Sequence, residues 1–396
     1  MKSYDAVIVG GGASGIVAAI FGKRKGASVL LCEKMPKLGK KLLVTGAGRC
    51  NLLNEKLDAS FYNPEARKLV QAVLEKCGRD AILGFFRDLG LRVYTDETGR
   101  IFPVTQQAAS VLKVLELEMA RLEVPVKLNC EVRDIRAVAG AFEIRTANEE
   151  RFISPKVIVC AGGKSYPALG ADGSAYGLVR KFGHAVTEPV PCAVPLLAKD
   201  SWCHFLQGQK IRAKVAARVD GKPACDAAGE LLFTQYGLSG TAILDVSREV
   251  SIAVNRDGKK NVCVAADLIP FMGDAELQKE FERRLEKKFS GEDLLEGLLP
   301  HKFSLVFREK LLKEDVPALV KALKHKEFKV NGTRGWNEAE FTAGGVPSEE
   351  VDPPTLESKR QKGLYLAGEI LDVQGPRGGY NLAWAWASGA VTGASI

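Results

Sequence analysis

The chain has 396 residues, 46% of them hydrophobic and 26% charged, which is enough for two or three domains and is typical of a soluble protein. The net charge of +8 comes from scattered lysines without an arginine-rich run, so it favours attraction of anionic small molecules over nucleic-acid binding. The nine cysteines are widely spaced and lack a C-x-x-C pair, which indicates reduced thiols rather than a disulfide framework or a zinc site.

The ends of the sequence carry no sign of a targeting or membrane segment. Met1 to Asp5 lead straight into the first apolar run, which leaves no room for a signal peptide. The weakly polar run from Tyr380 to Ile396 is interrupted by glycines and serines and is too short to span a bilayer. We therefore expect a cytoplasmic protein with a small-molecule substrate and with neither nucleic acid nor membrane as partner. The sequence does not decide between a monomer and a homo-oligomer.

The first 33 residues predict a strand, a glycine turn, a helix and a second strand. Val7–Val9 is an apolar run, after which Gly10 permits a tight turn and Gly12 lets the backbone approach a pyrophosphate. Gly15 brings the helix close to the strand, and the helix N-terminus aims its free N–H groups at the phosphates. Glu33, at the end of the second strand, would accept hydrogen bonds from a ribose hydroxyl. The motif predicts a dinucleotide site and does not distinguish NAD from FAD.

The chain then alternates helices and strands up to about residue 193. A loop dense in glycine and cations covers 36–51. Hydrophobic periodicity next predicts two helices within 64–88, a hairpin over 91–102, a helix over 108–122, a strand at 126–128 and a hairpin over 142–153. Val157–Val159 repeats the strand-into-glycine pattern, so we expect it to join the same parallel sheet as Val7–Val9.

The middle of the sequence has a different pattern. Three prolines within 189–195 predict a linker, and short strands and turns are expected from there to about residue 261. Further helices are expected at 275–289, 291–298, 302–312 and 316–324, and a last strand and helix at 364–366 and 383–391. The sequence thus predicts a nucleotide-binding domain of residues 1–193 and 340–396, interrupted by a β-rich insert, 194–265, and a helical part, 266–339.

Motifs along nearly the whole chain resemble one family. They are Gly10–Gly15, Gly39–Asn51, Gly99–Pro103, Ala161–Pro167, Leu232–Gly240, Thr342–Val346 and Gly368–Leu382. In these segments the sequence resembles the HI0933-like (YhiN-like) flavoproteins, which include aminoacetone oxidases and bile-acid-inducible (BaiN-like) reductases. The resemblance implies an α/β fold, with a glutathione-reductase-type FAD-binding Rossmann-like domain and an inserted β-barrel-plus-helical domain.

The resemblance also implies FAD as the bound cofactor, and we expect NADH or NADPH as a transient electron donor. Lys40 or Lys41 would lie near phosphate or ribityl, and Thr45 to Gly48 near the flavin N5 edge. The backbone of Val132 would read the adenine edge, and the helix after Gly379 would aim at the flavin N1/O2 edge. The cofactor-binding residues implied are Gly10, Gly12, Ala13, Ser14, Gly15, Glu33, Lys34, Lys40, Lys41, Thr45, Gly46, Gly48, Arg49, Asn51, Val132, Ala161, Gly162, Gly163, Gly368, Glu369, Asp372, Gly379, Tyr380, Asn381 and Leu382.

Catalytic groups are harder to find in the sequence. The four histidines share no metal-ligand spacing, so no metal site is expected. By the resemblance, Tyr380 and Tyr236 could donate a proton near the flavin, although a phenol with a pKa of ~10 needs tuning to do so. Arg49 could activate Cys50 as a redox thiol, but no second cysteine lies close in sequence, and we favour a structural role for Cys50.

The predicted activity is that of an FAD-dependent oxidoreductase. We expect NAD(P)H to deliver a hydride to flavin N5, which passes it to an electron-poor, enone-like carbon of a small organic substrate held between the flavin and the insert. One alternative is a flavin amine oxidase that takes a hydride from an aminoacetone-like amine and uses O2 as acceptor. A second alternative is a flavin redox sensor without turnover.

Overall fold

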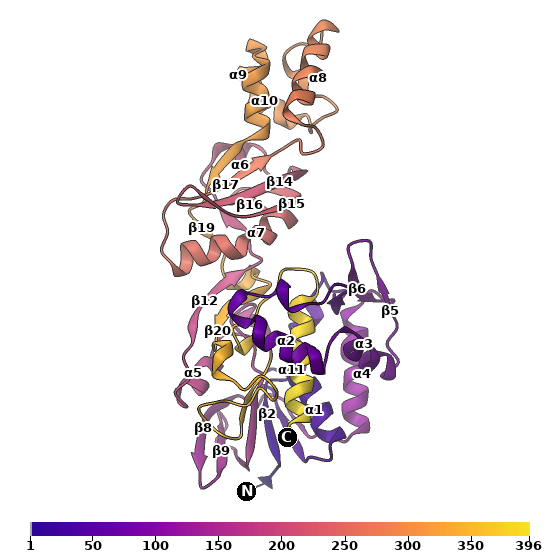
Figure 1. The fold of residues 1–396 in the computed structure, drawn as a ribbon, viewed down its shortest axis with the longest axis vertical. Helices are drawn as coiled ribbons and strands as arrows, with labels where there is room; N and C mark the ends of the chain where they lie inside the picture. Colours follow the sequence, from indigo (N-terminus) through magenta and orange to yellow (C-terminus); the bar gives the residue numbers. More distant parts are fainter. Residues whose placement is uncertain (1) are drawn as a thin grey trace. The chain divides into compact units, whose positions relative to one another are not determined.

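The computed structural model describes residues 2–396, which form two compact units (Figure 1). The first unit extends up to Pro189 and resumes from Glu340 to Ile396, and the second is Val190–Ala339. Each unit has its own core of buried apolar side chains. No helix within residues 2–396 combines the length and the apolar character needed to cross a lipid bilayer.

A five-stranded parallel sheet forms the centre of the first unit. Its strand order is β21 (Leu364–Leu366), β11 (Lys156–Val159), β2 (Ala6–Val9), β3 (Val29–Cys32) and β7 (Val126–Lys127). Val157 pairs with Val7 in parallel register, which confirms the sheet expected from the two strand-into-glycine runs. Every residue of β2 and β3 is buried, as continuous apolar runs predict for strands covered on both faces.

Two helices far apart in sequence lie side by side on this sheet (Figure 1). They are α1 (Ala13–Arg24) and α11 (Tyr380–Ala394). A Cβ atom on Gly389 would approach the backbone oxygen of Ser14 to 2.4 Å, and one on Gly393 would approach that of Ala18 to 2.3 Å. The two glycines therefore allow the backbones of α1 and α11 to touch.

Smaller elements surround the parallel sheet. The helices are α2 (Arg67–Lys76), α3 (Arg79–Asp88), α4 (Ala108–Arg121) and α5 (Ala175–Arg180). A four-stranded sheet contains β1 (Lys2–Ser3), β10 (Arg151–Ser154), β9 (Ala141–Thr146) and β8 (Val132–Val138), and a three-stranded sheet contains β4 (Leu53–Asn54), β6 (Arg100–Pro103) and β5 (Val93–Thr95). The predicted helices within 64–88 and at 108–122, and both predicted hairpins, are confirmed.

The second unit is a seven-stranded antiparallel sheet with helices. In order, the strands are β18 (Lys326–Lys329), β17 (Val262–Asp267), β14 (Lys210–Val219), β15 (Lys222–Thr234), β16 (Gly237–Ser239), β13 (Leu196–Leu197) and β19 (Gly332–Thr333). The helices are α6 (Ser201–Phe205), α7 (Thr241–Ser251), α8 (Asp274–Glu286), α9 (Lys302–Lys313) and α10 (Val316–Lys324). The helix α7 packs on β14 and β15.

Several expected local structures differ from the fold. The predicted linker is partly a strand, because β12 (Thr187–Cys192) forms a two-stranded sheet with β20 (Phe341–Gly345). The region expected to hold only short strands contains the long strands β14 and β15 and the helix α7. The predicted helix at 291–298 is only a 3-10 turn, Gly291–Leu295, because Gly291 and Gly297 both have positive φ angles.

Candidate functional site: a glycine-lined cavity

A cavity with about 1290 Å³ of empty space, part of it open to solvent, lies where β2, β3 and β11 end. Ligands of open parallel sheets bind at this edge, beyond the carboxyl ends of the strands. The wall contains the segments 9–14, 32–35, 39–42, 130–132 and 160–162. The remaining lining residues are Lys37, Thr45, Leu169, Gly170, Ala171, Ser174, Ala175, Leu178, Glu340, Phe341, Glu369, Val373, Asn381, Leu382, Trp384 and Ala385.

The glycines of the first turn have different surroundings. Gly10 has a φ of +104°, and a Cβ there would lie 2.6 Å from the backbone oxygen of Cys160. A Cβ on Gly15 would lie 1.9 Å from the backbone oxygen of Gly10, so this glycine lets α1 pack against the turn. A Cβ on Gly12 would meet no protein atom within 4 Å. Gly12 therefore leaves open space at the cavity rather than relieving a clash within the protein.

The first turn of α1 faces this space with unused donors. Its N-cap is Gly12, no side chain caps it, and its first turn holds no acidic residue. Ala13 and Ser14 both line the cavity. Uncapped N–H groups and the positive end of the helix dipole favour a bound anion, so the arrangement fits a pyrophosphate.

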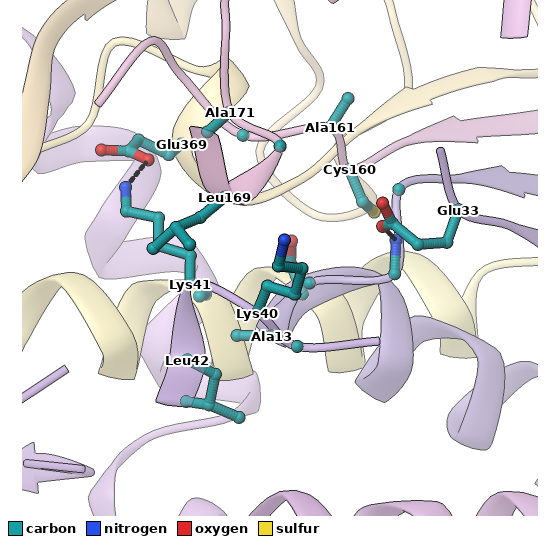
Figure 2. Close-up of a pocket in the computed structure, with 18 of the residues that line it drawn as sticks. Ala13, Glu33, Lys40, Lys41, Leu42, Cys160, Ala161, Leu169, Ala171 and Glu369 are labelled. Carbon is teal, nitrogen blue, oxygen red and sulfur yellow. Dashed lines mark hydrogen bonds and ion pairs between the residues drawn. The ribbon is translucent and has the colours of Figure 1, made fainter. Parts of the chain in front are cut away.

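Glu33 is held rigidly at one end of the cavity (Figure 2). Its side chain accepts the backbone N–H of Gly11 at 2.6 Å and that of Met35 at 2.7 Å. The residue is only 8% exposed, yet it lines the cavity. A carboxylate has about four acceptor positions, so two stay available for hydroxyl groups such as those of a ribose.

The two neighbouring lysines of the next loop have different partners. The Lys41 ammonium group lies 2.6 Å from both the Glu369 carboxylate and the Ser165 hydroxyl. Lys40 extends into the cavity between this pair and Glu33 (Figure 2). No carboxylate pairs with Lys40 within the part of the chain that the structure describes. Lys40 is therefore a cation available to an anionic ligand at the middle of the cavity.

A polar cluster fixes Glu369 at the other end. Its Oε1 accepts the backbone N–H of Thr342 at 2.8 Å and the Ser165 hydroxyl at 3.2 Å. The Thr342 hydroxyl accepts the backbone N–H groups of Lys164 and Ser165 at 2.9 and 3.2 Å. These bonds tie β20 to the loop after β11, so the Lys41–Glu369 pair is held by two distant segments.

The N-terminus of α11 also reaches the cavity. Gly379 is its N-cap, with a φ of +103°, and no side chain caps it. The Asn381 side chain accepts the backbone N–H of Gly375 and donates to its carbonyl, both at 3.0 Å, which shapes the loop before the helix. Asn381 and Leu382 line the cavity, so a second uncapped helix end is available to a ligand.

Fifteen of the residues predicted from the sequence are brought together around this cavity. They are Gly10, Gly12, Ala13, Ser14, Glu33, Lys34, Lys40, Lys41, Thr45, Val132, Ala161, Gly162, Glu369, Asn381 and Leu382. Their roles toward a cofactor stay predictions.

The other predicted cofactor residues do not line it. Several support the wall: Gly163 packs on Thr342, Gly368 packs on Ser14, and the Asp372 carboxylate accepts the backbone N–H of Gly344 at 2.9 Å. The remaining ones are Gly15, Gly46, Gly48, Arg49, Asn51, Gly379 and Tyr380. In the exposed part of the loop, the Arg49 guanidinium lies 4.8 Å from the centre of the Phe102 ring.

Neither of the two tyrosines proposed as proton donors is among the residues that line the cavity. The Tyr380 ring packs against the Phe61 ring in a tilted arrangement with ring centres 4.7 Å apart, and burial raises the pKa of the Tyr380 phenol. Tyr236 belongs to the second unit, where the Arg334 guanidinium lies 4.6 Å from its ring centre. Burial also raises the pKa of the Cys50 thiol to about 12, which agrees with a structural role for Cys50.

Other lining residues were missed by the sequence reasoning. Cys32 ends the apolar strand β3 and Cys160 directly follows β11, so the apolar pattern could have placed both at the ligand edge of the sheet. Leu169, Ala171 and Phe341 come from loops and a strand that reach the cavity only through tertiary folding. No local signal in the sequence marks these three positions.

Known proteins resemble the chain over nearly its whole length. The model of the HI0933-like protein Rossmann domain matches residues 4–395. The chain is 38% identical over 401 residues to a 3-dehydro-bile acid delta(4,6)-reductase of Clostridium scindens, covering 98% of this chain and 97% of that protein. It is 29% identical over 412 residues to a ribosomal RNA dihydrouridine synthase of Haemophilus influenzae, covering 100% and 99%.

A solved structure shares the fold. The 3-ketosteroid-delta4-(5alpha)-dehydrogenase of Rhodococcus jostii has a TM-score of 0.53 over 99% of this chain and 97% of that one, at 12% identity. The parallel sheet, the glycine turn and the full-length family match agree with one another. The chain therefore belongs to the HI0933-like family of FAD-dependent oxidoreductases.

Proposed function

We propose that the chain is an NAD(P)H-dependent reductase that uses FAD to reduce a carbon–carbon double bond conjugated to a carbonyl group. The observation that carries this direction of reaction is the 38% identity to a delta(4,6)-reductase over 98% of the chain. The match covers 98% of this chain and 97% of that protein, so it includes the insert as well as the parallel-sheet unit.

The cavity has the donors that FAD requires along its length. We assign the pyrophosphate to the uncapped start of α1 and to Lys40, and the adenosine ribose to Glu33. The Lys41–Glu369 pair and the start of α11 would hold the ribityl and flavin half. When bound, FAD supplies the two-electron chemistry, accepting a hydride from one molecule and giving it to another. The task of these side chains is then binding and orientation.

An enone-like acceptor fits both curated relatives. A 3-oxo steroid with a double bond at position 4 is a conjugated enone, and the double bond of uracil that is reduced in dihydrouridine is also conjugated to a carbonyl. The activities of these two relatives, on a bile acid and on ribosomal RNA, therefore share one kind of reacting bond. We favour a small polycyclic enone as the substrate because the identity to the bile-acid enzyme is higher, 38% against 29%.

Uridine in ribosomal RNA is the second candidate substrate. It is favoured by the match to the dihydrouridine synthase, which covers 100% of this chain. The net charge of +8 is compatible with an anionic steroid or with RNA, whereas the scattering of the lysines without an arginine-rich run favours the small molecule.

Anaerobic stopped-flow mixing tests the proposal. We expect NADH or NADPH to bleach the yellow absorbance of the purified protein, and a 3-oxo-Δ4 steroid or an unmodified ribosomal RNA to restore it. Bleaching by aminoacetone alone, with peroxide formed in air, would instead identify an amine oxidase. Retained FAD that no donor bleaches would overturn the reductase and favour a redox sensor.

A further inference from the structure

Two cysteines face the proposed adenosine end of the cavity from neighbouring strands. Cys32 is the last residue of β3, and Cys130 follows β7 in the same sheet. Both line the cavity, although Cys32 is only 1% and Cys130 only 5% exposed. Neither cysteine belongs to the glycine turn or to the lysine–glutamate pair, and neither bonds to the Glu33 side chain in the contacts described above.

Backbone hydrogen bonds hold the two residues close together. Cys32 pairs with Lys127 in the parallel ladder, and the N–H of Cys130 donates to the carbonyl of Glu33 at 2.8 Å. This hydrogen bond places Cys130 beside Glu33, the residue that follows Cys32, although Cys130 lies three residues beyond the ladder partner Lys127. The backbone thus brings the two cysteines to the same edge of the sheet.

The thiols interact with each other unequally. A hydrogen bond between the two thiols raises the pKa of Cys32, and burial raises it further. The same hydrogen bond lowers the pKa of Cys130 and outweighs burial and the Glu150 carboxylate, which both raise it. Cys130 is thus the more readily ionised of the two thiols, which makes it the candidate for the attacking sulfur and Cys32 the candidate for the resolving sulfur.

We propose that Cys32 and Cys130 form a redox modification site that a hydroperoxide converts to a disulfide. The Cys130 thiolate attacks one peroxide oxygen, the O–O bond breaks, and a sulfenic acid and hydroxide form. The Cys32 sulfur then attacks the sulfenic sulfur, the S–O bond breaks, and water leaves with the thiol proton. In total, two thiols lose two electrons and two protons, and one hydrogen peroxide becomes two waters.

The modification would change the wall where the cofactor is proposed to bind. A disulfide holds its sulfurs about 2.05 Å apart, closer than two thiols in contact, so the 130–132 segment must move toward β3. Glu131 and Val132 belong to that segment and line the cavity. This consequence rests on the proposed FAD site, and we expect FAD to dissociate at least about tenfold faster from the oxidised protein, equivalent to about 1.4 kcal/mol.

Peptide mapping of the flavin-loaded protein tests the pair directly. Trypsin releases Cys32 in residues 26–34 and Cys130 in residues 128–133, each peptide with a single cysteine. After one equivalent of hydrogen peroxide and alkylation, we expect these two peptides to be linked and to have lost two hydrogen atoms. We expect Cys32→Ser to leave a sulfenic acid at Cys130 that dimedone traps, and Cys263→Ser, in the second unit, to behave as the wild type.

Unlinked 26–34 and 128–133 peptides, in a sample where other cysteines have reacted, would overturn the proposal. Equal loss of FAD from wild type and Cys130→Ser after peroxide would overturn the effect on the cofactor. The peptide linkage is read without reference to flavin. A protein that binds no FAD but forms the linkage would therefore contradict the proposed function and support the thiol site.

Discussion

Lys40 and Lys41 show what neighbouring residues of the same type can do differently. The sequence predicts that one of them approaches the phosphate or ribityl groups, and the pattern cannot choose between them. The fold separates them, because Lys41 pairs with Glu369 whereas Lys40 extends into the open cavity. Glu369 lies far away in sequence, so the difference depends on tertiary contacts that local patterns do not encode.

The roles of the glycines in the first turn could be predicted from the sequence because each depends on local backbone geometry. Gly10 needs a positive φ, and Gly15 must approach the Gly10 carbonyl, and both requirements follow from the motif. The position of Cys130 could not be predicted from local sequence. Its contact with Cys32 depends on the parallel pairing of strands that are almost a hundred residues apart.

Gly12→Val should produce a folded protein without FAD. A Cβ at this position meets no protein atom within 4 Å, so the fold has room for the new side chain while the pyrophosphate would not. We expect unchanged far-ultraviolet circular dichroism and FAD affinity reduced at least about tenfold. The measurement is the flavin-to-protein absorbance ratio after gel filtration, followed by fluorescence titration with FAD.

Gly84→Val in α3 is the matched control for Gly12→Val, because a Cβ there also meets nothing within 4 Å and Gly84 lies outside the cavity. We expect it to keep full FAD occupancy. A yellow Gly12→Val protein with normal affinity would contradict the assignment of the pyrophosphate to the first turn.

Among the secondary-structure elements, success followed from strong local patterns. The strands β2 and β11 were found because they are apolar runs followed by glycine. The helix α7 was missed although Ala242, Ile243, Val246 and Val250 form one buried face at helical spacing. The sequence before α7 is rich in glycine and has a β-like pattern, and this pattern predicts turns rather than a helix. The predicted helix at 291–298 failed for the opposite reason, since its leucines are periodic but the glycines at both ends take positive φ angles.

One buried polar cluster joins three elements that the sequence does not connect. His184 lies after α5 and contacts Glu350 at 2.5 Å and the Ser358 hydroxyl at 2.7 Å. Arg360 and the backbone N–H of Ala185 also donate to the Glu350 carboxylate. Burial raises the pKa of Glu350, but these hydrogen bonds outweigh burial and hold its pKa below the ordinary value of 4.5.

This cluster predicts acid-sensitive stability. Because the folded-state pKa of Glu350 is lowered, its contribution is fully present above about pH 4.5 and is lost as the pH falls through the folded-state value. We expect Glu350→Gln to lower the free energy of unfolding at pH 7 by about 2 kcal/mol. Urea denaturation at several pH values should show this difference shrink below pH 4.5.

The neighbouring Glu349 is exposed and provides the control. We expect Glu349→Gln to change the free energy of unfolding by less than about 0.5 kcal/mol at every pH. An equal difference between wild type and Glu350→Gln at pH 7 and at pH 3 would contradict the proposed linkage.

The two units of the chain have separate cores, and the second is continuous in sequence. Its buried residues come from β14, β15, β17 and from the helices α7 to α10, all within Val190–Ala339. The sequence predicted an insert from the change of composition near Pro189, and this signal is available because three prolines interrupt the periodic pattern. The curvature and pairing order of the insert's sheet could not be predicted, since they depend on long-range contacts.

Residues 190–339 should therefore fold when produced alone. We expect a colourless protein with a single calorimetric transition and an unfolding enthalpy of about 100 kcal/mol near 60 °C. The colour and the transition test different points, because colour reports the cofactor and the transition reports the core. A broad transition without a heat-absorption peak would show that this core depends on the rest of the chain.

The backbone contact between α1 and α11 has a consequence for biosynthesis. The helix α1 follows the glycine turn and packs against Gly389 and Gly393 of α11. These two glycines are synthesised long after the glycine turn itself. Nascent chains that stop before α11 contain the complete nucleotide fingerprint but lack the helix that holds it in place. We therefore expect FAD to bind only after α11 has been translated. Every shorter product would lack FAD when it encounters the chaperones and proteases of the cell.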